Sequence, residues 1–229
     1  GINALLSEPI SRSSADQRAG RAGRLGPGYC LRLWSHTEHE KRVEFDLPEI
    51  RRIDLSQIYL NLLRFDLYLD QLDLFDPVAQ VALSDAKAKL KELGALTDQN
   101  NLTAHGTRMS QLPVDPNWSH ALLKANEKNL APVIALLLAM LEERPPVQSD
   151  VLTDFYPMPS PRSDAYCLLL AFEEASRRKF SVEDCRKLGI HAGRCKDSEL
   201  LAHSLCNMLG LEYKLEIPSF DESFDIMIC

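Results

Sequence analysis

The sequence predicts a mainly α-helical protein with small β elements, and two observations carry that prediction. Apolar residues recur at helical spacing in several segments after residue 50. Stretches with β-strand character are few and short, and they cover residues 2–10, 29–34 and 95–104. A chain of 229 residues is long enough for one large domain or a few small ones.

The composition is that of an ordinary globular protein, with 45% hydrophobic and 26% charged residues. The longest apolar run, residues 131–141, falls short of the roughly 18 residues of a membrane span and predicts a buried core helix.

Six cysteines occur without a Cys-x-x-Cys pair, which disfavours a zinc or redox site and favours reduced thiols in the cytoplasm. His36 and His39 have no third ligand nearby in the sequence, so we expect no metal in this chain.

The first part of the chain predicts a strand, a helix and a second strand. Residues 2–10 have the small and apolar character of a strand. Ser14 and Gln17 fit a capping box, with serine as the N-cap and glutamine at N3 of the helix. Gly26-Pro27-Gly28 predicts a turn that leads into a buried strand over Tyr29–Trp34.

The middle of the chain predicts the order helix, helix, hairpin, which is typical of a winged helix. Helices are expected over residues 53–63 and 80–93, and Gly94 suits the left-handed position that ends the second helix. Two short strands are expected within residues 95–104, on either side of residues 98–101.

The second of these helices would lie in a groove of DNA if the winged helix recognised DNA. Its only cations are Lys87, Lys89 and Lys91, and Asp85 and Glu92 lie beside them. This mixed charge favours a structural, domain-bridging role over DNA readout.

Beyond Pro113 the chain predicts only helices. Asp115 is a suitable N-cap followed by proline at N1, and residues 130–141 should lie at the centre of a bundle. Arg144-Pro145-Pro146 ends that helix, and the proline-rich residues 147–161 predict a long loop. Three further helices are expected, over Asp164–Arg177, Val182–Leu188 and Ser198–Leu209. Their expected N-caps are Ser181 and Asp197, and their expected stops are Gly189 and Gly210.

The most informative stretch is Gln17-Arg18-Ala19-Gly20-Arg21-Ala22-Gly23-Arg24. Its three arginines lie three residues apart, so a helix would align them as a stripe of like charge. Each glycine disfavours a helix interior by about 1 kcal/mol relative to alanine. A segment that is locally so unfavourable indicates a functional site. Because guanidinium forks match phosphate oxygens, the octet predicts a phosphate site.

The net charge of −7 counts against a stand-alone nucleic-acid binder. One short segment nevertheless carries an excess of positive charge, because residues 12–24 contain four arginines and the single carboxylate of Asp16. The basic segment therefore predicts a focused anion site, and any RNA affinity would depend on a groove shared with other domains.

The octet resembles motif VI of superfamily 2 helicases, in the Gln-Arg-x-Gly-Arg-x-Gly-Arg form of the DEAH-box branch. The rest of the chain resembles DEAH-box proteins in the same order, at Pro48-Glu49-Ile50, Leu93-Gly94-Ala95-Leu96, Leu112-Pro113-Val114-Asp115-Pro116, and Cys185 with Leu188-Gly189-Ile190-His191. The series covers most of the chain and points to the bacterial HrpB-type members.

The resemblance implies four regions. Residues 1–47 would be the C-terminal end of the second RecA-like domain, 48–113 a winged-helix domain, 114–212 a helical-bundle or ratchet domain, and 213–229 a truncated C-terminal segment. The bundle would line the path of RNA, although each candidate arginine taken singly fits a solvated surface residue better than an RNA contact. These candidates are Arg162, Arg177, Arg178, Arg186 and Arg194.

The resemblance also implies roles in a site that binds ATP and Mg²⁺ between two RecA-like domains. Arg21 and Arg24 would be catalytic arginine fingers on the γ-phosphate, and Gln17 would position the phosphate or the attacking water, unless it serves as a helix cap. Arg18 would pair with acidic groups across the cleft, and Gly20 would belong to the nucleotide-binding surface. The sequence contains no Gly-Lys-Ser/Thr and no Asp-Glu-Ala-His. We therefore expect this chain to be part of a longer enzyme, and to be inactive and without cofactors by itself.

Two other classes of protein stay open. A non-enzymatic winged-helix adaptor would use residues 48–113 to bind a partner, but it leaves the arginine octet unexplained. A DNA helicase would share motif VI, and the choice of RNA as the partner rests on the resemblance alone.

Overall fold

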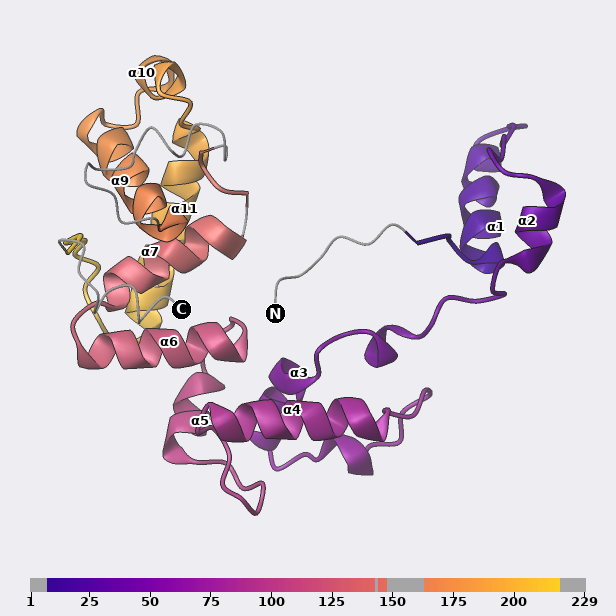
Figure 1. Ribbon diagram of the computed structural model, residues 1–229, viewed down its shortest axis with the longest axis horizontal. Helices are drawn as coiled ribbons and strands as arrows, with labels where there is room; N and C mark the ends of the chain where they lie inside the picture. The colour runs from indigo at the N-terminus through magenta and orange to yellow at the C-terminus, as the bar shows by residue number, and fades with distance from the viewer. Residues whose placement is uncertain (1–7, 143, 148–162, 219–229) are drawn as a thin grey trace. The chain divides into compact units, whose positions relative to one another are not determined.

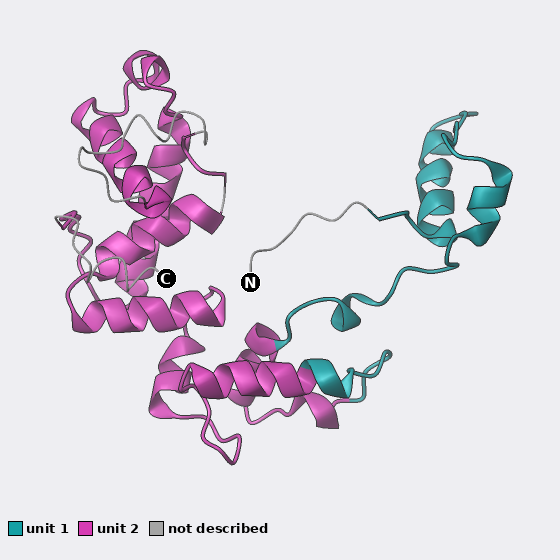
Figure 2. Ribbon diagram, in the orientation of Figure 1, with its two compact units in different colours: residues 1–55, 73–82 teal, residues 56–72, 83–229 magenta. Residues whose placement is uncertain are grey.

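The computed structural model describes residues 8–142, 144–147 and 163–218. The chain is mainly α-helical, as predicted (Figure 1), and its regular β structure in these ranges consists of two isolated bridges, Leu96–Leu102 and Val147–Ile190. It divides into two compact units: unit 1 comprises residues 1–55 and 73–82, and unit 2 comprises residues 56–72 and 83–229 (Figure 2). The domains expected from the resemblance stay predictions.

The first helix of unit 1, α1 (Arg12–Gly20), begins earlier than predicted. Its N-cap is Ser11, whose extended backbone lets the side chain accept a hydrogen bond from the amide of Ser14 at 3.0 Å. The predicted capping box at Ser14 and Gln17 is therefore wrong, because Ser14 already lies inside the helix. The 3-10 helix η1 (Arg21–Gly23), the helix α2 (His36–Lys41) and the 3-10 helix η2 (Glu49–Arg51) follow.

The predicted strands of unit 1 do not form in the described residues. Residues 2–7 of the first lie outside the described ranges, and residues 8–10 have no regular structure. Tyr29–Trp34 is irregular, and the alternating side chains of Tyr29, Leu31 and Leu33 are 100%, 85% and 87% exposed. A strand needs a neighbour that pairs with its backbone and covers its apolar face, and the described part of the chain supplies neither.

Helices of the predicted winged-helix region occur in the expected order. α3 (Ser56–Leu63) starts later than predicted and buries Tyr59, Leu60 and Leu63. The 3-10 helix η3 (Leu69–Gln71) follows, and then α4 (Gln80–Glu92), whose bounds agree with the prediction. Gly94 has a φ of +68°, so the expected left-handed stop is confirmed.

The hairpin after α4 is shorter than predicted. A single bridge joins Leu96 to Leu102, and the amide of Thr97 donates to the carbonyl of Asn101 at 2.9 Å. Gly106, in α5 (Ala104–Met109), closes the hairpin: a Cβ there would lie 2.1 Å from the carbonyl oxygen of Ala95. The hairpin is thus held by close packing against a helix, because its two arms are too short to form strands.

The bundle surrounds α7 (Ala131–Glu142), which is buried as predicted. Nine of its twelve residues are buried, and the helix contacts α6 (Pro116–Glu127), α9 (Asp164–Arg177) and α11 (Ala192–Met208). Figure 1 shows α11 crossing α7, and α9 lies beside α7. Within the described ranges, no helix combines the length and apolar character needed to cross a membrane.

Most local signals of the bundle are confirmed, and one is wrong. Asp115 caps α6 with Pro116 as its first residue, Ser181 caps α10 (Val182–Lys187), and Gly189 and Gly210 have positive φ. Asp197, however, lies inside α11, whose N-cap is His191. Burial of Ala192 and Cys195 extends this helix by more than a turn before the predicted start. Apart from Val147, the predicted loop over 147–161 lies outside the described residues.

Four cysteines are core residues of the bundle. Cys167, Cys185, Cys195 and Cys206 are fully buried, whereas Cys30 is exposed. Burial raises the pKa of the Cys195 thiol to about 12, so it stays protonated and unreactive at neutral pH. In the described part of the chain, no three side chains of the His, Cys, Asp or Glu type gather into a potential metal site.

Candidate functional site

The three arginines of the octet follow one helical path across α1 and η1. Arg18 lies in the last turn of α1, Arg21 is the C-cap of α1, and Arg24 is the C-cap of η1; both caps have right-handed helical dihedrals. All three side chains are exposed. None of them forms an ion pair or a side-chain hydrogen bond with any residue in the described ranges. The predicted stripe of like charge therefore exists and faces outward without an internal counter-ion.

The helix itself offsets part of the repulsion within this stripe. The C-terminal end of a helix carries partial negative charge, which favours nearby cations by about 0.3–1 kcal/mol each. Arg18 and Arg21 lie at that end of α1. The glycines leave this surface open, since no heavy atom lies within 4 Å of a Cβ placed on Gly20 or Gly23. The arrangement presents three guanidinium groups that can meet an anion from outside.

The opposite end of α1 is closed by the chain itself. The amides of Arg12 and Ser13 donate to the carbonyls of Val43 and Glu44 at 2.9 and 3.0 Å. The amide of Ser11 donates to a carboxylate oxygen of Asp46 at 3.2 Å. A helix N-terminus binds anions through free amides, and these amides are occupied. An anion that binds α1 would therefore meet the arginine side chains at its C-terminal end and not the amides at its start.

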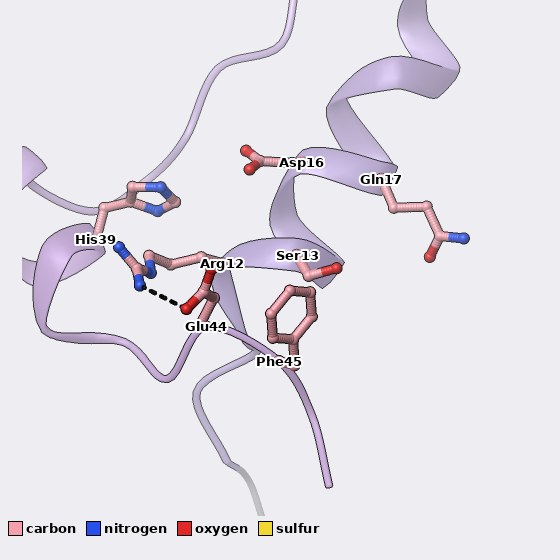
Figure 3. Close-up of a pocket in the computed structure, with 7 residues that line it drawn as sticks. All are labelled: Arg12, Ser13, Asp16, Gln17, His39, Glu44 and Phe45. Atoms are coloured by element: carbon pink, nitrogen blue, oxygen red, sulfur yellow. Dashed lines mark ion pairs between the residues drawn. The ribbon is translucent and has the colours of Figure 1, made fainter. Parts of the chain in front are cut away.

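An open pocket of about 540 Å³ lies beside α1, and Figure 3 shows its lining. It is formed by Arg12, Ser13, Asp16, Gln17, His39, Glu44 and Phe45. An ion pair at 3.7 Å between Arg12 and Glu44 lies at its base. Gln17 reaches the pocket rim, whereas Arg18, Gly20, Arg21 and Arg24 do not line it. The three arginines thus follow one another along α1 and η1, and none of them lines the pocket.

A polar chain that the sequence did not reveal joins α1 to α2. The guanidinium of Arg32 pairs with Asp16 at 2.5 Å and lies 3.2 Å from Nε2 of His39. Because arginine only donates, Nε2 of His39 accepts and the ring proton lies on Nδ1. That Nδ1 is buried without a partner among the described residues, as are Nε of Arg12 and Nε of Arg42. No signal in the sequence pointed to the contacts among Asp16, Arg32 and His39, because these residues are distant from one another in the sequence.

Unit 1 also exposes an unusual amount of apolar surface. Leu25, Leu31 and Leu33 are 105%, 85% and 87% exposed, and Phe45 and Leu47 are 68% and 62% exposed. Large apolar side chains exposed in this number are typical of a surface that contacts another part of a protein. The arginines therefore lie in a unit whose apolar side chains are left uncovered by the described residues.

The arginines predicted to contact RNA differ in their pairing. Arg177 pairs with Glu173 at 2.9 Å and Arg178 with Glu174 at 2.6 Å, both within α9. Arg194 donates to the carbonyl of Pro145 at 3.1 Å and so holds the chain that follows α7. Arg186, on α10, has no such partner in the described part of the chain. Arg162 lies outside the described residues.

The lysines of α4 are engaged within unit 2. Lys87 pairs with Asp70 at 3.6 Å and lies 5.2 Å from the ring centroid of Tyr59. Lys89 pairs with Asp115 at 3.7 Å, and Lys91 donates to the carbonyl of Asp98 at 2.9 Å. These contacts tie α4 to its neighbours, which favours the structural role over DNA readout.

Comparison with solved structures supports a relationship to HrpB-like helicases. The chain is similar to the E. coli DExH-box NTPase HrpB, at 37% sequence identity with a TM-score of 0.54. The match covers 62% of this chain and 18% of that chain, so the shared region is a small part of the solved protein. No family model matches the chain.

Proposed function

We propose that this chain is the C-terminal part of an ATP-dependent RNA helicase of the DEAH-box type. The observation that carries the proposal is the outward-facing stripe of Arg18, Arg21 and Arg24, which no carboxylate among the described residues neutralises. The similarity to a DExH-box NTPase supports it. The exposed apolar side chains of unit 1 support a further RecA-like part that covers them.

In this proposal the arginines act on the γ-phosphate of ATP. Arg21 and Arg24 donate to its oxygens and stabilise the charge that develops in the transition state, while Gln17 orients the phosphate or the attacking water. Arg18 pairs with an acidic group across the cleft, and Gly20 lets the nucleotide approach the backbone. An arginine finger contributes about 10³–10⁵ in rate, or roughly 4–7 kcal/mol, whereas a surface ion pair contributes about 1 kcal/mol or less.

The remaining parts of the ATP site must come from elsewhere in the intact protein. The phosphate-binding Gly-Lys-Ser/Thr and the acidic residues that hold Mg²⁺ do not occur in this sequence. In the proposal, movement of the RecA-like domains reaches RNA through the winged-helix and bundle regions. Among the predicted RNA contacts in the described residues, Arg186 is the one whose guanidinium is engaged neither by a carboxylate nor by a carbonyl.

The test uses the intact protein that contains this chain. We expect Arg21→Lys and Arg24→Lys each to lower ATP turnover by about two orders of magnitude or more, because lysine lacks the planar fork that meets two oxygens. RNA affinity should stay nearly unchanged. Arg51→Lys, at an exposed arginine of η2, is the matched control and should keep normal turnover. Normal steady-state ATPase activity in Arg21→Lys would rule out the finger assignment.

A further inference from the structure

A second hollow of about 660 Å³ lies in unit 2, between α3, α7, α11 and residues 113–115. We call it the bundle groove. Its floor is apolar, since Leu138 and Leu205 are almost fully buried beneath it. Its rim exposes Leu201 at 36% and Met208 at 53%. An exposed leucine and a flexible methionine around an apolar floor are typical of a surface that binds apolar side chains.

One end of the bundle groove carries negative charge. Glu142 lines it and is the last residue of α7, where the helix already presents partial negative charge. The last turn of α7 contains no basic residue, and Glu142 has no ion-pair partner in the described ranges. Asp115 adds a second carboxylate to the lining, although Lys89 lies 3.7 Å from it. A cation placed beside Glu142 would be stabilised by its carboxylate and by the C-terminal end of the helix.

We propose that the bundle groove binds a peptide segment that carries apolar side chains and at least one lysine or arginine. Apolar side chains fill the floor, and the cation meets Glu142. A nucleic acid does not fit, because its phosphates would meet the two carboxylates. A second copy of this chain is disfavoured by its net charge of −7. The proposal does not depend on ATP hydrolysis or RNA binding.

The experiment selects a phage-displayed library of random peptides of about twelve residues on the immobilised chain. The binding of all enriched peptides to the original chain and to its variants is measured by fluorescence anisotropy. The peptides should be rich in apolar and basic residues. They should bind Leu201→Asp about tenfold more weakly and Glu142→Lys about fivefold more weakly.

Two matched controls separate the groove from general effects of charge and surface. Leu200→Asp changes the neighbouring leucine, which is 69% exposed and does not line the groove. Glu92→Lys changes the last residue of α4, as Glu142→Lys changes the last residue of α7. Both controls should bind the peptides as the original chain does. Glu142→Lys places a cation at a helix C-terminus, so its effect should not come from unfolding, and circular dichroism checks this.

Several results would overturn the proposal. The first is a selection that enriches no peptide, or only acidic peptides. The second is an equal loss of peptide affinity in Leu200→Asp and Leu201→Asp. Binding of single-stranded RNA that is lost in Leu201→Asp would make the groove a nucleic-acid site instead. A sedimenting dimer that Leu201→Asp dissociates would make it a contact between copies.

Discussion

Pairing with neighbouring carboxylates decides which arginines of the bundle are free to bind phosphate. Arg177 and Arg178 lie one turn after Glu173 and Glu174, a spacing at which helical side chains meet. RNA phosphates would have to compete with these glutamates. Arg186 has no such competitor in the described residues, so its guanidinium is ready to meet a phosphate.

This difference predicts how single substitutions change RNA binding by the intact protein. We expect Arg186→Ala to weaken binding and to reduce the slope of log K against log salt by about 0.7, the value of one phosphate contact on a single strand. Arg177→Ala and Arg178→Ala should act in the same direction with smaller losses. ATP turnover should change little. Titrations of labelled RNA at several salt concentrations measure both quantities.

Arg108→Ala is the control for loss of charge alone, because Arg108 is an exposed arginine of α5. An equal change of slope in Arg108→Ala and Arg186→Ala would mean that the bundle arginines act only through net charge. The same titrations with DNA of matching sequence would test whether the partner is RNA.

At the scale of the elements, a histidine pair joins α5 to α6. Nδ1 of His120 lies 3.0 Å from the carbonyl oxygen of Leu93 and 3.0 Å from Nε2 of His105. Because a carbonyl only accepts, Nδ1 of His120 carries a proton, and this one N–H is shared between the carbonyl of Leu93 and Nε2 of His105, which both accept. Protonation of His105 would place its Nε2–H opposite the Nδ1–H of His120, and two donors facing each other would break this contact.

Stability should therefore fall as the solution becomes acidic. Burial, followed by the charges of His120, Lys124 and Arg108, lowers the pKa of His105 below its ordinary value of 6.5, while Glu127 opposes the shift. A histidine with a lowered folded-state pKa stabilises the fold above the unfolded pKa. That contribution is lost as the pH falls from about 6.5 through the folded-state value. Urea titrations from neutral to mildly acidic pH measure this loss.

The variant His105→Gln should flatten this pH dependence, since the titrating group is gone. His36→Gln is the matched control, because His36 is exposed and lies outside the α5–α6 contact. The interpretation fails if His105→Gln keeps the full slope of the original chain.

At the scale of the whole molecule, the two units differ in how much apolar surface they bury. α1 buries a single residue, Ala15, whereas most of α7 is buried. Local opening needs little free energy where few apolar contacts are lost. We expect fast amide hydrogen exchange in residues 2–24 and slow exchange in residues 130–141, measured by mass spectrometry. Slower exchange in residues 2–24 than in α7 would refute this division.

The chain by itself should neither bind nor hydrolyse ATP. Its arginines can donate to a phosphate, but the sequence lacks the phosphate-binding loop that supplies most of the affinity. Titration of labelled ATP into the chain should give no saturable signal, while the intact protein serves as the positive control. Saturation in the low micromolar range would show that the site is complete within this chain.

The sequence by itself determined the features that depend on neighbouring residues. The bounds of α4 and α9, the caps at Asp115 and Ser181, and the left-handed stops at Gly94, Gly189 and Gly210 all follow from local chemistry. The burial of α7 follows from its unbroken apolar character. The spacing of Arg18, Arg21 and Arg24 likewise placed the stripe before any contact was known.

Only the tertiary structure decided features that depend on distant residues. Residues 43–46 approach the start of α1 and cap it at Ser11 in place of Ser14, and Tyr29–Trp34 stays irregular where no described strand pairs with it. Packing of Ala192 and Cys195 moved the start of α11. The histidine pair and the bundle groove join residues that are far apart in the sequence. The physical reason is that a hydrogen bond or an apolar contact between such residues exists only once folding brings them together.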